Sequence, residues 1–155
     1  MMRLSTRGRY GVRAMFALAL RYGQGPIPLK DVSQREEISI NYLEQLFVHL
    51  RREGLVEGAR GPKGGFFLTK KPSRIKIGDV IRAVEGPISL VYCVDLGKKK
   101  KECHRADRCI TRLLWKRTSE KLTEILDAVT LEDLCEEGRR LSKGEEPKHP
   151  FAFQI

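Results

Sequence analysis

Three of the four cysteines lie close together in the second half of the chain, where their thiols could bind a metal or do redox chemistry. Cys93, Cys103 and Cys109 fall within 17 residues, with nine residues between the first two and five between the last two. In a reducing compartment, this clustering favours metal or redox chemistry over a disulfide framework. Structural zinc sites usually begin with a tight C-x2–4-C pair, which this sequence lacks, whereas iron–sulfur clusters accept varied spacings. The spacing alone leaves a cluster, a zinc ion and unligated thiols open.

His104 directly follows Cys103 and is a candidate ligand beside the three thiols. An enzyme would use Cys103 or Cys109 as a nucleophile and His104 as its base. Neighbours in sequence form a poor catalytic pair, because nucleophile and base normally meet through the fold and need a third orienting group. We therefore predict that the protein is not an enzyme. Cys135 stands apart and is expected to pack as a small apolar residue of a short helix.

A second set of chemically suited side chains lies in the segment 39–53, which is predicted to be a helix. The apolar residues of its buried face recur at i, i+3, i+4 and i+7: Leu43, Leu46, Phe47 and Leu50. Glu44 lies at the flank of that face, and four side chains point away from it: Asn41, Gln45, Val48 and Arg52. Asn and Gln suit adenine, Glu accepts from cytosine, and Arg prefers guanine, so this face could read DNA in the major groove.

Positive charge is concentrated in the first half of the chain. Residues 1–75 carry 14 Lys and Arg against 6 Asp and Glu, whereas residues 76–155 carry 16 against 14. This asymmetry favours a nucleic acid as the partner, with an anionic membrane surface as the weaker alternative. The longest apolar run, Ala14–Leu20, has seven residues, far short of the roughly 20 that cross a bilayer. We therefore expect a cytoplasmic protein that binds double-stranded DNA and no membrane.

Three predicted helices and a hairpin organise the first half. The helices are expected over about residues 5–22, over Leu29–Glu36, and from a cap at Ser39 or Asn41. Two short apolar runs around the Gly- and Pro-rich segment 58–65 predict a β-hairpin. This order predicts a mainly α fold with a small β-hairpin wing, a winged helix-turn-helix whose third helix enters the major groove.

Basic side chains outside the third helix are expected to contact the DNA backbone. Arg60 and Lys63 lie at the predicted hairpin tip, and four more lie near the first helix: Arg3, Arg7, Arg9 and Arg13. Such contacts supply affinity but carry no sequence information.

A long helix is predicted from about Cys109 to Val129 in the second half. Its apolar stripe suits pairing with a second copy of the chain through a seam of Leu122, Ile125 and Val129. Packing back on its own domain is the alternative. A capping box beginning at Thr130 predicts a last short helix. We thus expect a homodimer joined by a long C-terminal dimerisation helix.

Several segments together resemble the IscR family of iron–sulfur cluster regulators, over about residues 2–135. They are Met2–Tyr10 (MRLSTRGRY), Tyr42–Phe47 (YLEQLF), Gly54–Val56, Arg60–Pro62 with Gly64 and Gly65, and the three downstream cysteines. The resemblance implies a homodimeric winged-helix transcription factor that controls cluster-assembly genes, usually as a repressor. It also implies a [2Fe-2S] cluster held by Cys93, Cys103 and Cys109, and cluster donor proteins as possible partners.

The sequence departs from the family pattern at the fourth ligand. The family places a histidine three residues after its last cysteine, where this chain has Arg112, whose guanidinium stays protonated and cannot ligate. His104 and Asp107 lie inside the loop and are the candidate substitutes. A nitric-oxide-sensing branch of the family uses a carboxylate from the first helix, but Arg9 stands at the matching position here.

These predictions divide the chain into four parts. They are a winged helix-turn-helix domain over 1–85, a cluster-binding loop over 86–108, a dimerisation helix with a short helix over 109–143, and a flexible tail over 144–155. The loop includes Lys98–Lys101, which is expected to be a solvated basic run. The alternative function for this fold is a zinc- or thiol-responsive regulator, such as a repressor of cysteine metabolism.

Overall fold

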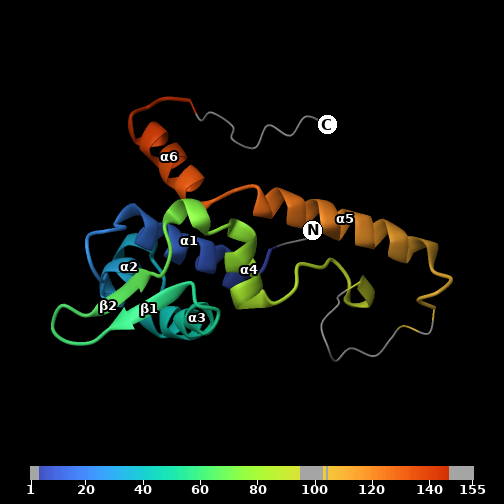
Figure 1. Cartoon of the computed structure of the whole chain (residues 1–155), viewed down its shortest axis with the longest axis horizontal. Helices are drawn as coiled ribbons and strands as arrows, with labels where there is room; N and C mark the ends of the chain where they lie inside the picture. Colours follow the sequence, from blue (N-terminus) through green and yellow to red (C-terminus); the bar gives the residue numbers. More distant parts are fainter. Residues whose placement is uncertain (1–3, 95–102, 104, 147–155) are drawn as a thin grey trace.

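The computed structural model describes residues 4–94, 103 and 105–146. Its elements, in order, are α1 (Thr6–Leu20), α2 (Leu29–Glu36), α3 (Ile40–Arg52), β1 (Val56–Ala59), β2 (Gly65–Leu68), η1 (Pro72–Arg74), α4 (Ile77–Glu85), η2 (Tyr92–Val94), α5 (Ile110–Asp127) and α6 (Leu131–Ser142). The first four α-helices and the hairpin form one body, from which α5 projects (Figure 1). The predicted mainly α, winged helix-turn-helix architecture is confirmed.

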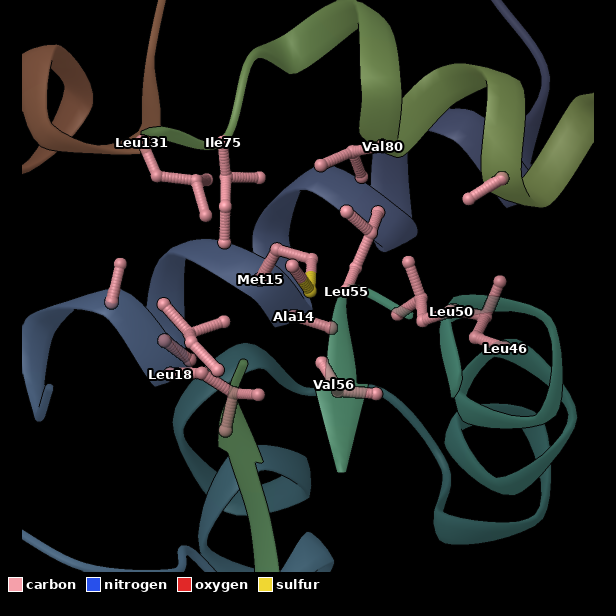
Figure 2. Packing of buried hydrophobic residues seen from close by; sticks show 14 of the residues in the cluster. Ala14, Met15, Leu18, Leu46, Leu50, Leu55, Val56, Ile75, Val80 and Leu131 are labelled. Carbon is pink, nitrogen blue, oxygen red and sulfur yellow. The ribbon is translucent and has the colours of Figure 1, made fainter. Parts of the chain in front are cut away.

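Helix α1 lies at the centre of the core. The Ser5 hydroxyl caps it by accepting the Gly8 N–H at 3.2 Å. Ala14, Met15 and Leu18 of α1 are at most 1% exposed. Figure 2 shows the apolar side chains packed around them, which come from α3, β1, α4 and the ends of η1 and α6: Leu46, Leu50, Leu55, Val56, Ile75, Val80 and Leu131. A single core therefore joins all the elements of the first half and the start of α6.

Helices α2 and α3 make the helix-turn-helix. Helix α3 begins at Ser39, whose hydroxyl accepts the Tyr42 N–H at 3.4 Å. All four residues predicted to form its buried face are at most 1% exposed: Leu43, Leu46, Phe47 and Leu50. Between the two helices, Glu37 adopts a left-handed backbone with φ of 54°. This residue turns the chain sharply enough for α3 to cross α2.

The hairpin forms the predicted wing. Its strands pair antiparallel, with Val56 opposite Leu68 and Ala59 opposite Gly65. Phe66 also pairs with Ile27, in the segment between α1 and α2, through two backbone hydrogen bonds of 2.9 Å. The wing is thereby fixed to the body of the domain, while its loop extends beyond it (Figure 1).

The second half is attached to the first at several points, which include a backbone bridge between Lys76 and Thr130. At the C-terminal end of α5, Asp127 accepts hydrogen bonds from the Arg82 guanidinium of α4 at 2.7 and 3.3 Å. Helix α6 then packs on α1, and its Leu131 and Cys135 belong to the core. The predicted capping box at Thr130 is present, with Asp133 as its partner. No helix among the described residues has the length and apolarity to span a bilayer.

Candidate DNA interface and cysteine site

The outward face of α3 carries the predicted base-reading residues. Asn41, Glu44, Gln45 and Arg52 are all exposed, opposite the buried face of the helix. At 100° per residue, their side chains cover one side of the helix over three turns. The structure therefore brings together on one face two amides, a carboxylate and a guanidinium, which have three different hydrogen-bonding preferences.

A network of aromatic and charged side chains holds α3 in place. The rings of Tyr42 and Tyr10 meet edge to face at 5.6 Å, and the Arg13 guanidinium lies 5.5 Å from the Tyr10 ring. Arg13 also donates to the largely buried Glu36 carboxylate at 3.1 Å, at the end of α2. Sequence reasoning missed this network. The one available signal was an Arg among the apolar residues of the first helix.

Aromatic packing also joins α3 to the wing. The rings of Phe47 and Phe66 lie 4.6 Å apart, so the buried side of α3 rests directly on β2. Arg60 and Lys63 are exposed in the hairpin loop, and Gly61 between them has a φ of 107° that favours glycine. Helix α3 and strand β2 thus pack directly on each other, which fixes the wing beside α3.

The basic residues near α1 are placed on the surface. Arg7 and Arg9 are both exposed. Arg9 donates to the Thr6 hydroxyl at 3.4 Å, and Arg7 reaches the Val84 carbonyl at 3.5 Å. Arg3 lies outside the described residues. Both described guanidinium groups remain accessible to a phosphate.

The three clustered cysteines come from three different elements. Cys93 lies in η2, Cys103 in the loop, and Cys109 caps the N-terminus of α5; all three are half-buried and free. The pKa of the Tyr92 hydroxyl is raised by the negative charge of the neighbouring Cys103 thiolate and by a hydrogen bond to it, with a smaller contribution from Cys93. Tyr92 therefore lies beside both thiols.

Cys109 has a different environment from the other two thiols. Its sulfur lies 3.2 Å from the Thr111 hydroxyl. This hydrogen bond lowers the pKa of the Cys109 thiol, with further contributions from the Arg112 backbone N–H and the positive charge of Arg105. A thiolate, the form that binds metals, is thereby favoured at the start of α5.

Arg112 bridges the two segments that carry the cysteines. Its Nε donates to the Cys93 carbonyl at 3.0 Å, and its guanidinium also reaches the Ala106 carbonyl at 3.5 Å. The sequence showed that this side chain cannot ligate a metal, but it gave no sign of these long-range hydrogen bonds. Arg112 thus ties η2 to the loop that precedes Cys109.

The described side chains do not form a completed metal site. No three His, Cys, Asp or Glu residues among them converge on one point. His104 and Lys98–Lys101 lie outside the described residues, and Asp107 is exposed. Cys135 is 5% exposed in the core, and burial raises the pKa of its thiol, which confirms its predicted packing role.

Comparison with known proteins assigns the chain to a family. The Rrf2 family, described as "Iron-dependent Transcriptional regulator", matches residues 4–137. The chain belongs to the Rrf2 family. Two of its relatives are named HTH-type transcriptional regulator IscR. The protein of Klebsiella pneumoniae (strain 342) is 46% identical and that of Pectobacterium atrosepticum 44%, each over 133 residues that cover 86% of this chain and 79% of the relative.

Solved structures of the family share the fold. CymR of B. subtilis, titled "the Global Cysteine Regulator", is 42% identical with a TM-score of 0.70, covering 88% of this chain and 98% of that one. The structure of T. potens IscR is 37% identical with a TM-score of 0.71, covering 88% of each chain. This Rrf2 protein is therefore a DNA-binding transcriptional regulator, and the prediction that it is not an enzyme is confirmed.

Proposed function

We propose that this regulator senses an iron–sulfur cluster of the [2Fe-2S] type and represses cluster-assembly genes as a homodimer. The observation that carries the proposal is the presence of three half-buried free thiols, Cys93 in η2, Cys103 in the loop and Cys109 at the N-terminus of α5. The relatives named IscR support it through 44–46% identity over most of the chain. Cluster donor proteins would supply the group.

The donor chemistry at these positions fits such a group. Three thiols are the ligands that iron–sulfur clusters take most readily, and the pKa of Cys109 is already lowered toward the thiolate form. His104 is the candidate for the fourth ligand, because Arg112 cannot serve. When bound, the cluster would be a redox-active group, and its presence and its redox state would respond to iron and to oxidants. The chain's own part is to hold the thiols, and Arg112 does this by joining η2 to the loop.

DNA binding is assigned to α3 and the wing. The exposed amides, carboxylate and guanidinium of α3 would meet base edges in the major groove, while Arg60 and Lys63 follow the backbone or the minor groove. Arg3, Arg7 and Arg9 would add phosphate contacts.

The dimer is assigned to α5. All 18 of its residues are described, and Ser119 is the one that is buried. Its exposed apolar side chains are Ile110, Leu113, Leu114, Trp115 and Ile125. Val129 was expected in the seam but is 7% exposed within the intrachain core, because the chain has already turned toward α6. The seam proposed here therefore begins nearer the cysteines than the sequence predicted, and a second copy covers it.

Contacts along α5 could carry a change at the cysteines to the DNA-binding half. In the middle of α5, the Leu90 N–H donates to the buried Ser119 hydroxyl at 3.1 Å, which fixes the segment before Cys93 on α5. At its C-terminal end, Asp127 holds Arg82 of α4. A Cβ on Gly78 would lie 1.8 Å from the Asp127 carboxylate, so this close approach needs a glycine in α4.

Anaerobic purification followed by iron and sulfide analysis tests the proposal. We expect equal iron and sulfide and a red-brown visible spectrum for the wild type. Replacing Cys93, Cys103 or Cys109 by Ala should remove the iron, the sulfide and the visible spectrum. Cys135→Ala is the matched control and should retain all three. Colour loss in Cys135→Ala alone would contradict the assignment of the ligands.

A zinc- or thiol-responsive regulator of cysteine metabolism is the second candidate. It is favoured by the 42% identity to CymR, which exceeds the 37% identity to the solved IscR structure. A colourless anaerobic protein that contains zinc or only free thiols would select this candidate and reject the cluster.

A further inference from the structure

Val48 is an apolar residue on the polar, exposed face of α3. It is 66% exposed, which makes it the most exposed large apolar side chain among the described residues 4–94. At 100° per residue, Asn41, Gln45 and Arg52 all lie within about 60° of Val48 around the helix axis. A valine thus occupies the middle of the polar face assigned to base reading.

The folded chain alone gives no reason for a valine at this position. The side chain contributes nothing to the core, and its β-branch makes valine a weaker helix former than Ala, Leu, Glu or Lys. An apolar group at the centre of such a face gains free energy only when another apolar group covers it. The chemistry of that covering group is set by the neighbours of Val48.

We propose that Val48 contacts the 5-methyl group of a thymine in the major groove. The proposal rests on α3 being the DNA-reading helix. The thymine methyl is the apolar group that base pairs present in the major groove, and small apolar side chains recognise it. Gln45, one turn earlier on α3, suits adenine. Three residues advance a helix by about 4.5 Å, close to the base step of about 3.4 Å, so Val48 reaches the base pair next to the one that Gln45 reads.

The charge around Val48 favours DNA over a protein as the covering partner. Arg51 and Arg52 flank its side at the C-terminal end of α3, and both are exposed. Arg60 and Lys63 extend the positive charge to the wing. An apolar side chain surrounded by guanidinium groups and amides matches the major groove of a duplex. There the thymine methyl lies between the phosphates and the hydrogen-bonding groups of the bases.

Deoxyuridine substitution tests this assignment, because it removes the methyl and leaves every hydrogen-bonding group of thymine. The full-length wild type first selects its preferred duplexes from a random pool, and each thymine is then replaced by deoxyuridine in turn. We expect one thymine per half-site at which the change weakens binding about three- to fivefold, the effect of one buried methyl group. Val48→Ala should weaken binding to the thymine duplex by a similar factor and show no further loss on the deoxyuridine duplex.

Two controls separate this contact from general effects. Leu141→Ala removes another exposed apolar side chain, 60% exposed on α6, and should keep the full deoxyuridine effect. Because Ala is the better helix former, Val48→Ala should unfold at the same temperature as the wild type or slightly higher.

The proposal is overturned if Val48→Ala keeps the full deoxyuridine effect, or if no thymine of the wild-type site shows one. A change in self-association with an unaltered deoxyuridine effect would overturn it as well, by assigning Val48 to a protein contact. If α3 is not the DNA-reading helix, the result differs from all of these. Gln45→Ala and Arg52→Ala would then bind the selected duplex as tightly as the wild type.

Discussion

The winged-helix half and the cysteine-bearing half of the chain are stabilised in different ways. In the first half, α1, α3, α4 and the hairpin share one core whose central side chains are at most 1% exposed. In the second half, α5 buries one of its 18 residues, and an open groove of about 380 Å³ lies between it and the segment 87–94. Hydrogen bonds of Ser119 and Arg112 join the parts there in place of apolar packing.

This difference indicates which half can change its conformation in response to a signal. Local opening costs little free energy where few apolar contacts are lost, and sensing elements are drawn from such regions. The residues proposed to read DNA lie on the well-packed half, and contacts such as Arg82 with Asp127 connect that half to α5. The hydrogen bond to Asp127 also raises the pKa of the Arg82 guanidinium.

The largest expected effect concerns the charge of the rigid half. If six to ten phosphates are neutralised per dimer, log K for DNA should fall with log[salt] with a slope of roughly −5 to −9. Fluorescence anisotropy between low and moderate salt measures this slope. The double variant Arg60→Ala/Lys63→Ala removes four basic side chains per dimer and should reduce the magnitude of this slope by about 4. The matched double variant Lys116→Ala/Lys121→Ala on α5 should leave it unchanged; an equal reduction there would place DNA on the second half too.

A pair of leucines tests the contrast in packing. Leu50→Ala in α3 creates a cavity in the core and should lower the free energy of unfolding by about 2–5 kcal/mol. Leu114→Ala in α5 removes a side chain that is 55% exposed, so it should change the unfolding of the monomer by less than about 0.5 kcal/mol. The α5 variant should instead weaken the dimer in light scattering. A Leu114→Ala protein that unfolds as easily as Leu50→Ala would show that α5 belongs to the core.

Arg112→Ala should loosen the cysteine-bearing half alone. Losing the hydrogen bond to the Cys93 carbonyl should raise the alkylation rate of Cys93 about five- to tenfold, because this bond is worth about 1–1.5 kcal/mol of local stability. Mass spectrometry that resolves the modified cysteines measures the rate, with buried Cys135 as the internal reference. Arg108→Ala removes the same charge from the adjoining loop and serves as the control. Equal acceleration in both variants would mean that charge, rather than the hydrogen bond, sets the rate.

Sequence reasoning predicted the periodic parts of the molecule and missed the parts that depend on distant contacts. The start of α3 follows from its capping residue Ser39 and its buried face from a 3.6-residue repeat, which are local signals. The contacts of Arg112 with Cys93 and of Arg13 with Glu36 join residues 19 and 23 positions apart, and no local pattern marks them. Val129 was misplaced for the same reason, because the turn after α5 decides whether it faces the core or a partner.

The smallest expected effect comes from the one strained backbone position of the rigid half. Glu37 is the single described residue other than glycine with a positive φ, and it forms the turn that sets α3 against α2. A left-handed backbone costs an L-residue about 1–2 kcal/mol, and glycine avoids this cost but loses about 0.5–1 kcal/mol through its greater freedom in the unfolded chain. Glu37→Gly should therefore stabilise the protein by up to about 1 kcal/mol and raise Tm by about 2–4 °C in calorimetry. Glu37→Ala also removes the carboxylate but keeps the backbone cost, so it should give no comparable gain, and an equal gain would identify charge as the cause. Because glycine preserves the turn, DNA affinity should stay within a small factor of wild type, which would show that the rigid half gains stability without moving its recognition helix.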